Sequence, residues 1–110
     1  MPSPARIRST IATIAQPPED LLQAAIVHKA LADTTRLRIM ARLAEEPATV
    51  SDLIELVDLS QPLVSWHLRR LKVAGLVETR RSGREVICTL SRPALERFHQ
   101  KEHQMLGMDA

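Results

Sequence analysis

Leu59–Leu90 reads LSQPLVSWHLRRLKVAGLVETRRSGREVICTL, and this stretch predicts one helix followed directly by a β-hairpin. We expect Ser60 to cap the helix, with Pro62 in its first turn, where amide groups have no partner inside the helix. The helix should end near Ala74, because Gly75 can adopt the left-handed conformation that closes a helix.

The hairpin is indicated by two runs of alternating apolar and polar residues after the helix. These runs are Leu76–Arg80 and Glu85–Leu90, and they flank the segment Arg81–Arg84, whose Ser-Gly pair favours a turn. On the helix itself, apolar residues recur at the spacing of a single buried face. They are Val64, Leu68 and Leu71.

Positive charge is concentrated in the same stretch. Between Ser60 and Arg84 there are six Lys or Arg residues and one acidic residue, Glu78, which gives a local net charge of +5. The whole chain carries only +2. A rigid helix beside a cationic hairpin suits an anionic partner with a groove, and double-stranded DNA is such a partner.

Further helices are predicted on both sides of this stretch. They are Pro18–Leu31, Thr35–Leu43 capped within Asp33–Thr35, Thr49–Val57, and a last helix that starts after Ser91. Thr49 is a suitable cap, with Asp52 three residues on as a capping-box partner. The order predicts a mainly α protein with a two-stranded β-hairpin, which is a winged helix-turn-helix whose two central helices are Thr49–Val57 and Ser60–Ala74.

The length of 110 residues predicts one domain, which we assign to residues 18–108. Residues 1–17 are expected to form an N-terminal arm, either flexible or a short docking helix. A domain of this size buries a limited core, so dimerisation would bury more apolar surface. The apolar positions of the last helix are sparse: Leu95, Phe98, Met105 and Leu106.

The composition indicates a folded protein of the cytoplasm. The chain is 45% hydrophobic and 25% charged, and its single cysteine, Cys88, fits a reducing compartment. No apolar run approaches the ~20 residues that span a bilayer, so no membrane partner is expected. The sequence also lacks a Gly-rich phosphate loop, paired catalytic carboxylates and a nucleophile–base pair, which argues against an enzyme.

The helix face opposite the buried residues and the tip of the hairpin are the predicted DNA-binding surface. Its candidate residues are Gln61, Pro62, Ser65, Trp66, Arg69 and Arg70 on the helix, and Arg80, Arg81 and Arg84 on the hairpin. Gln can bond adenine through two atoms in the major groove, and Ser can bond bases or phosphates. The arginines are expected on backbone phosphates or in the minor groove. The alternative is that they form a solvated face.

Two aromatic positions leave alternatives open. Trp66 is either a partly covered surface side chain or an apolar contact to a sugar or a thymine methyl group. His67 precedes the buried Leu68, so a structural role that bonds a neighbouring loop is favoured over contact with DNA.

Three segments of the chain resemble the ArsR/SmtB-type repressors, namely Leu31–Leu43, Leu59–Val86 and the helix that follows. In the second segment the pattern SQPxVSxHLxxLKxAGLVxxRRxGR matches residue for residue. The resemblance covers about Ala25–Gly107. It implies a homodimer whose first and last helices form the interface, and repression by occupation of a DNA operator with release when an effector binds. The positions of the family's recognition-helix contacts are taken by Gln61, Ser65 and Trp66.

The chain departs from the family at its thiol sites. Many metal-sensing members carry Cys-x-Cys in the helix before the recognition helix, whereas Thr49–Asp52 reads TVSD and has no thiol. A soft-metal or arsenite site there is therefore excluded. Cys88 stands where the family often has Tyr, and alternation along the strand favours a buried, inert cysteine over a sensor thiol.

The last helix offers candidate metal ligands in His99, Glu102 and His103. The two histidines are four residues apart on one helix face and could bind Ni, Co or Zn. The family's site at this helix also draws an acid and a His from the helix start, and Ser91–Ala94 supplies neither. Other donors such as His28 would be needed, and without them the three residues are a solvated polar face.

The sequence therefore favours a dimeric, sequence-specific DNA-binding transcriptional regulator, a repressor released by an effector. One alternative is a metal-responsive regulator that uses His99, Glu102 and His103 at the dimer interface. Another is a winged-helix protein-interaction module. Gln61 and Ser65 favour DNA, because a purely electrostatic partner would need only the arginines.

Overall fold

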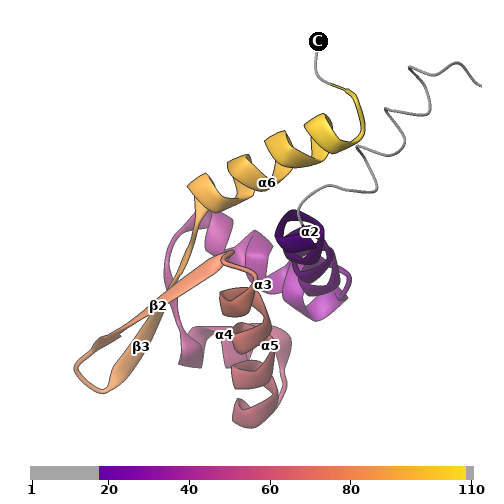
Figure 1. Ribbon diagram of the computed structural model, residues 1–110. Helices are drawn as coiled ribbons and strands as arrows, with labels where there is room; N and C mark the ends of the chain where they lie inside the picture. The colour runs from indigo at the N-terminus through magenta and orange to yellow at the C-terminus, as the bar shows by residue number, and fades with distance from the viewer. Residues whose placement is uncertain (1–17, 109–110) are drawn as a thin grey trace, which may run out of the picture.

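The computed structural model describes residues 18–108 of the chain (Figure 1). In chain order the elements are α2 (Pro18–Leu31), α3 (Thr34–Glu45), β1 (Ala48–Thr49), α4 (Val50–Val57), α5 (Gln61–Val73), β2 (Val77–Ser82), β3 (Glu85–Leu90) and α6 (Arg92–Met105). The predicted arm at residues 1–17 lies outside the described residues. Within residues 18–108, no helix has the length and apolar character needed to cross a membrane.

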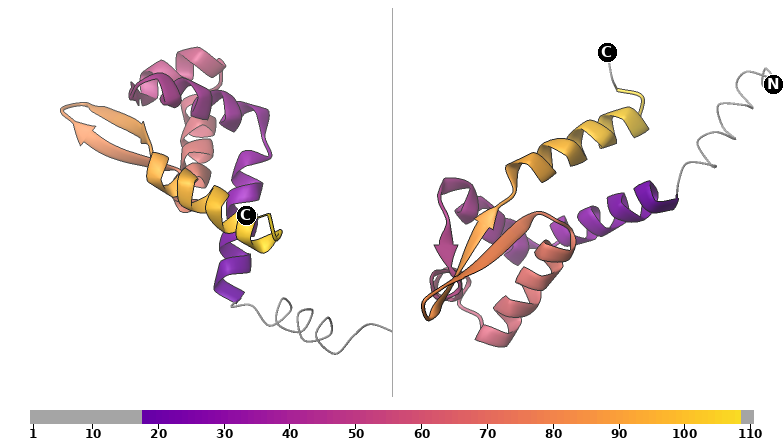
Figure 2. Two further views of the ribbon diagram at one scale, coloured as in Figure 1. Left: turned by 90° about the horizontal axis from the view of Figure 1, so that it is seen from above. Right: turned by 60° about the vertical axis from the view of Figure 1, so that its left-hand side comes forward.

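The predicted winged helix-turn-helix is confirmed. Helices α4 and α5 are joined by a short turn in which Asp58 adopts the left-handed conformation, with φ 54°. Strands β2 and β3 form an antiparallel hairpin, the wing, which projects away from the helices (Figures 1 and 2). The fold therefore presents α5 and the wing as two separate protrusions that one ligand can contact together.

The turn at the tip of the wing is two residues shorter than the sequence indicates. Ser82 pairs with Glu85, so the turn consists of Gly83 and Arg84 alone rather than the predicted four residues. Gly83 has φ 63° at the first central position, which is where a type II′ hairpin turn needs glycine.

A third strand was not predicted. The two residues of β1 pair with β3, Ala48 with Cys88 and Thr49 with Ile87, and the sheet has the order β1-β3-β2. Ala48 and Cys88 are both buried. Strand β1 therefore ties the inner strand of the wing to the start of α4.

Two helices begin with side-chain caps. At α4 the predicted capping box is present: the Asp52 amide donates to Thr49 Oγ1 and the Thr49 amide donates to Asp52 Oδ2, both at 3.1 Å. At α3 the Arg36 amide donates to Asp33 Oδ1 at 3.0 Å. These backbone hydrogen bonds lower the pKa of Asp33 and of Asp52, because they favour the charged carboxylate.

Ser60 occupies the N-cap position of α5, as predicted, and Ser91 occupies that of α6. Neither side chain makes the capping hydrogen bond expected at this position. An N-cap side chain bonds the second or third amide of its helix. In both helices the second residue is proline, Pro62 and Pro93, which has no amide hydrogen.

The hydrophobic core lies between α3, α4, α5 and the sheet. The predicted inward residues Val64, Leu68 and Leu71 are buried. They pack with buried side chains from the other elements. The largest of these are Ile39, Leu53 and Leu76. This core holds the helix-turn-helix and the base of the wing as one unit.

Two arginine side chains of α3 cap the C-termini of neighbouring helices by hydrogen bonds to their carbonyl groups. Arg36 is buried, and it donates from Nε to the Ala30 carbonyl at 2.7 Å and from Nη2 to the Lys29 carbonyl at 3.1 Å. Arg38 donates to the Leu56 carbonyl at 2.8 Å. Terminal helix carbonyls have no partner inside their helix, so these bonds satisfy groups that would otherwise need water.

Helices α2 and α6 are packed less completely than the other helices, and they lie apart from each other along much of their length (Figure 2). No side chain of α6 is buried, and α2 buries only Val27 and Ala30. Large apolar side chains on both helices are exposed instead. They are Leu21, Leu22, Ile26, Met105 and Leu106.

Candidate nucleic-acid interface

A groove of about 390 Å³ runs between α5 and the wing. From α5 it is lined by Gln61, Ser65 and Arg69, which are four residues apart and share one side of the helix. From the wing it is lined by Arg81 and Arg84. The structure therefore brings together five of the nine candidate residues, with two uncharged hydrogen-bonding groups between three cationic ones.

The other helix candidates form a second row on α5. Pro62, Trp66 and Arg70 each lie one residue further along, which rotates them by about 100° around the helix axis away from the wing. All three are exposed. The sequence predicted one exposed face on α5. In the structure its residues form two rows, of which one faces the wing and the other faces α3.

Arg80 lies on the opposite face of the wing from Arg81. Arg80 pairs with Ile87 and Arg81 pairs with Val86, and neighbouring residues of a strand point to opposite faces. Arg80 is exposed and does not line the groove.

Sequence reasoning missed several residues of the groove, among them Ser51, Lys72 and Thr79. Lys72 could have been found, because it lies three residues after Arg69 and so on the same side of α5. Ser51 and Thr79 come from α4 and β2, and only the packing of those elements brings them to the groove.

The structural role predicted for His67 is confirmed, but its partner is a side chain of α3 and not a neighbouring loop. His67 is buried, and Arg36 Nη1 lies 3.1 Å from its Nδ1. A guanidinium only donates, so Nδ1 accepts this bond. Asp33 Oδ1 is 4.0 Å from the same nitrogen, which is too far for a hydrogen bond. His67 thereby joins α5 to the arginine that closes α2.

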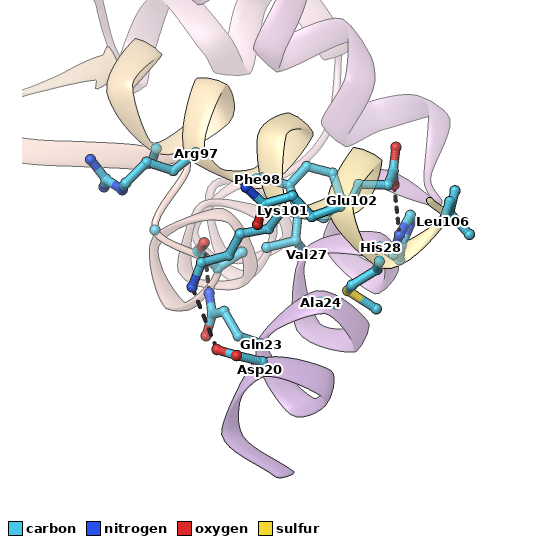
Figure 3. Close-up of a pocket in the computed structure, with 15 residues that line it drawn as sticks. Asp20, Gln23, Ala24, Val27, His28, Arg97, Phe98, Lys101, Glu102 and Leu106 are labelled. Carbon is cyan, nitrogen blue, oxygen red and sulfur yellow. Dashed lines mark hydrogen bonds and ion pairs between the residues drawn. The ribbon is translucent and has the colours of Figure 1, made fainter. Parts of the chain in front are cut away.

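A larger cavity, of about 730 Å³, lies between α2 and α6 (Figure 3). Its lining includes the apolar side chains of Val27, Phe98 and Leu106. Two polar contacts bridge the helices: Lys101 Nζ to Asp20 Oδ1 at 3.5 Å, and His28 Nε2 to Glu102 Oε2 at 3.0 Å. The two helices are therefore linked by exposed polar contacts across an incompletely filled apolar space.

The chain is similar in sequence to known bacterial regulatory proteins. Residues 33–79 match the family described as "Bacterial regulatory protein, arsR family". The HTH-type transcriptional regulator NmtR of Mycobacterium tuberculosis is 35% identical over 91 residues, which are 78% of this chain and 76% of NmtR.

The chain belongs to the ArsR family. The HTH-type transcriptional repressor SmtB of Mycobacterium tuberculosis is 44% identical over 78 residues, or 70% of this chain, and the match spans 58% of SmtB. A solved structure from Mycobacterium bovis, a homodimeric winged helix-turn-helix DNA-binding domain of a possible ArsR-family regulator, superposes with a TM-score of 0.65. It is 31% identical, and the match covers 74% of this chain and 77% of that domain.

The candidate metal ligands of this ArsR-family chain do not form a site within one protomer. Glu102 is engaged by His28, and His99 and His103 are exposed. Within residues 18–108, no three His, Cys, Asp or Glu side chains are grouped so as to hold a metal ion.

Cys88 is fully buried in the sheet, as the alternation predicts. Burial raises the pKa of its thiol, and the positive charge of Lys72 opposes that shift only in part. Because the thiolate is the reactive form, a buried cysteine with a raised pKa is chemically inert in the folded ArsR-family domain.

Proposed function

We propose that this chain is a cytoplasmic, sequence-specific DNA-binding transcriptional regulator that places α5 in the major groove. The observation that carries the proposal is the groove between α5 and the wing. It combines Gln61 and Ser65, which can read bases, with Arg81 and Arg84, which can bind phosphates. A surface selected only for charge would not need the two uncharged groups.

The two kinds of side chain would act on different parts of the duplex. Gln61 lies in the first turn of α5, the part of a recognition helix that contacts base edges. Arg69 lies two turns further along, where the helix leaves the groove and phosphates are closer. Arg81 and Arg84 on the wing would bind the backbone beside the same groove.

The active form would be a homodimer formed through α2 and α6. Leu22 and Leu106 are 63% and 66% exposed, and α6 buries no side chain within a single protomer. A second copy would cover this apolar surface and would present two α5 helices to a palindromic site. The Mycobacterium bovis domain, which is described as homodimeric, supports the dimeric state.

The regulation we propose is repression by occupation of an operator, with release when an effector binds. The similarity to SmtB, which is named a repressor, supports the first part. The His99, Glu102 and His103 cluster does not by itself support a metal effector, since one protomer supplies no grouped set of ligands among residues 18–108.

The proposal is tested with duplexes that the wild-type protein selects from a random pool, against a mixed-sequence duplex of equal length. Gln61→Ala should weaken binding to the selected duplex by about 1–3 kcal/mol more than binding to the mixed one. Arg81→Ala should weaken both alike and lower the salt dependence of log K by about one.

Arg42→Ala is the control, because it removes one positive charge of α3 that lies outside the groove and outside α2 and α6. It should leave the specificity unchanged. If Gln61→Ala weakens both duplexes equally, Gln61 does not read bases. Failure of the wild-type protein to select any sequence would contradict the proposed function.

A further inference from the structure

Trp66, the only tryptophan of the chain, lies against two arginine side chains. The guanidinium carbon of Arg70 is 5.1 Å from the centre of its ring and that of Arg36 is 5.5 Å away. Both distances fall within the range of cation–π attraction, for which tryptophan is the best partner. The ring of His67 meets it edge-on, with the ring centroids 4.9 Å apart.

One of these arginines is fixed in the protein. Arg36 is buried, and it uses Nε, Nη1 and Nη2 for hydrogen bonds to Ala30, His67 and Lys29. Trp66 therefore contacts a guanidinium that cannot move without breaking three bonds. The ring is only 39% exposed, although it is on the outer side of α5.

The other arginine is available to a ligand. Arg70 is exposed, and no carboxylate among residues 18–108 forms an ion pair with it. An exposed arginine normally loses about 2 kcal/mol of rotamer entropy when it is held in one place. Contact with the Trp66 ring restricts Arg70 before any ligand arrives, and so reduces the entropy lost on binding.

The location of this pair on α5 indicates what Arg70 would bind. Trp66 and Arg70 belong to the row that faces α3, whereas Gln61, Ser65 and Arg69 face the wing. If α5 lies in the major groove with Gln61 and Ser65 towards the bases, the wing approaches the backbone on one side. Arg70 then approaches the backbone on the other side of the groove.

We propose that Trp66 is a positioning residue that holds Arg70 for a DNA phosphate on the side of the major groove opposite the wing. This inference rests on the proposed function. In it Trp66 does not contact a base but acts on DNA binding through Arg70. A phosphate contact carries no sequence information, so Trp66 contributes to affinity and not to specificity.

The test is a double-mutant cycle on the full chain, with the selected and the mixed-sequence duplex as probes. Arg70→Ala should lower affinity for both duplexes by roughly tenfold, and Trp66→Ala by about threefold. The double variant should bind like Arg70→Ala alone, because Trp66 acts through Arg70. In the Arg69→Ala background, the threefold effect of Trp66→Ala should persist, since Arg69 lies on the other row.

A readout without DNA checks the contact itself. Arg70→Ala should make the fluorescence of Trp66 more easily quenched by acrylamide in the free protein, and Arg69→Ala should not. Trp66→Phe keeps an aromatic face and should bind DNA better than Trp66→Ala. This comparison distinguishes loss of the aromatic contact from loss of folding.

Three outcomes would overturn the inference. Additive effects of Trp66→Ala and Arg70→Ala would show that the two residues act separately. A selective loss of the selected duplex in Trp66→Ala would show that Trp66 reads bases; either result leaves the proposed function intact. A wild-type protein that binds no duplex overturns the proposed function and this inference together.

Discussion

The two halves of the molecule differ in how completely a single chain packs them. Around α5 the core is closed, and Val64, Leu71 and Leu76 have no exposed surface. In the layer of α2 and α6, Leu22 and Leu106 are more than 60% exposed and a cavity of about 730 Å³ separates the helices. The half around α5 is therefore closed within one chain, whereas the layer of α2 and α6 leaves apolar surface that, under the proposed function, a second copy would cover.

Because of this difference, the geometry within one protomer and the spacing between two protomers would depend on different parts of the molecule. The distance between α5 and the wing depends on the closed core, so it is set within each protomer. The distance between two α5 helices would depend on α2 and α6. A change in the open layer could then alter the fit to a two-half operator without altering the fit to each half-site.

The largest expected effect tests the closed half. Leu71→Ala should lower the free energy of unfolding by about 2–5 kcal/mol, because it leaves a cavity among fully buried side chains. Chemical denaturation followed by circular dichroism measures this. Val73→Ala, two residues along at a position that is 70% exposed, is the control and should change stability by less than about 0.5 kcal/mol.

The next prediction tests the open half. Leu106→Glu should raise the dissociation constant of the proposed dimer by more than about tenfold, since it puts an unpaired charge on the apolar surface that a second copy would cover. Sedimentation measures the assembly, and Val73→Glu provides an equally exposed control outside α2 and α6. If the wild-type protein stays monomeric at micromolar concentration, the proposal that a second copy covers α2 and α6 is wrong.

A smaller effect is expected at the cap of α3. Asp33→Ala should cost about 1 kcal/mol, because the first amides of the helix lose an acceptor, while Asp33→Asn should cost little. The pKa of Asp33 in the folded chain is below its ordinary value of 3.8. Its ionic stabilisation is therefore present above about pH 4 and is lost as the pH falls through the folded value.

Denaturation at a series of pH values checks both statements. The acid-side loss should be shallower in Asp33→Asn than in the wild type, because asparagine caps without titrating. An identical slope in the two proteins would show that the Asp33 carboxylate contributes nothing through its charge.

The smallest effect concerns the bridge between α2 and α6. The side chains of His28 and Glu102 are 60% and 30% exposed, so their contact is screened by water. Glu102→Gln should change the unfolding free energy by less than about 0.5 kcal/mol. A loss of 2 kcal/mol or more would mean that α2 and α6 stabilise each other within one chain, contrary to the comparison above.

Local signals in the sequence were sufficient for most of the fold. The helix Pro18–Leu31, the Thr49 capping box and the left-handed Gly75, which has φ 77°, were all predicted from nearby residues. Strand β1 was missed because two residues carry no periodicity, and its existence depends on Cys88 and Ile87 far along the chain.

The sequence predicted which residues belong to the candidate site, but it did not predict how they are arranged around α5 and the wing. Helical spacing puts Gln61 and Trp66 on the exposed side of α5, but it cannot say which one faces the wing and which faces α3. Arg36 shows the same limit. Nothing local predicts that this arginine is buried, because its partners come from α2 and from His67, 31 residues away.

Thr49 connects the wing to the helix-turn-helix. Thr49 pairs with Ile87 of the wing and also caps α4, so the wing and the helix-turn-helix are joined by a stiff link. This link limits how far the opening between α5 and the wing can change its width. A duplex whose groove is wider or narrower must deform to fit, and the energy of that deformation depends on base-pair steps that no side chain contacts. Under the proposed function, base pairs outside the reach of Gln61 and Ser65 would also affect which duplexes this protein prefers.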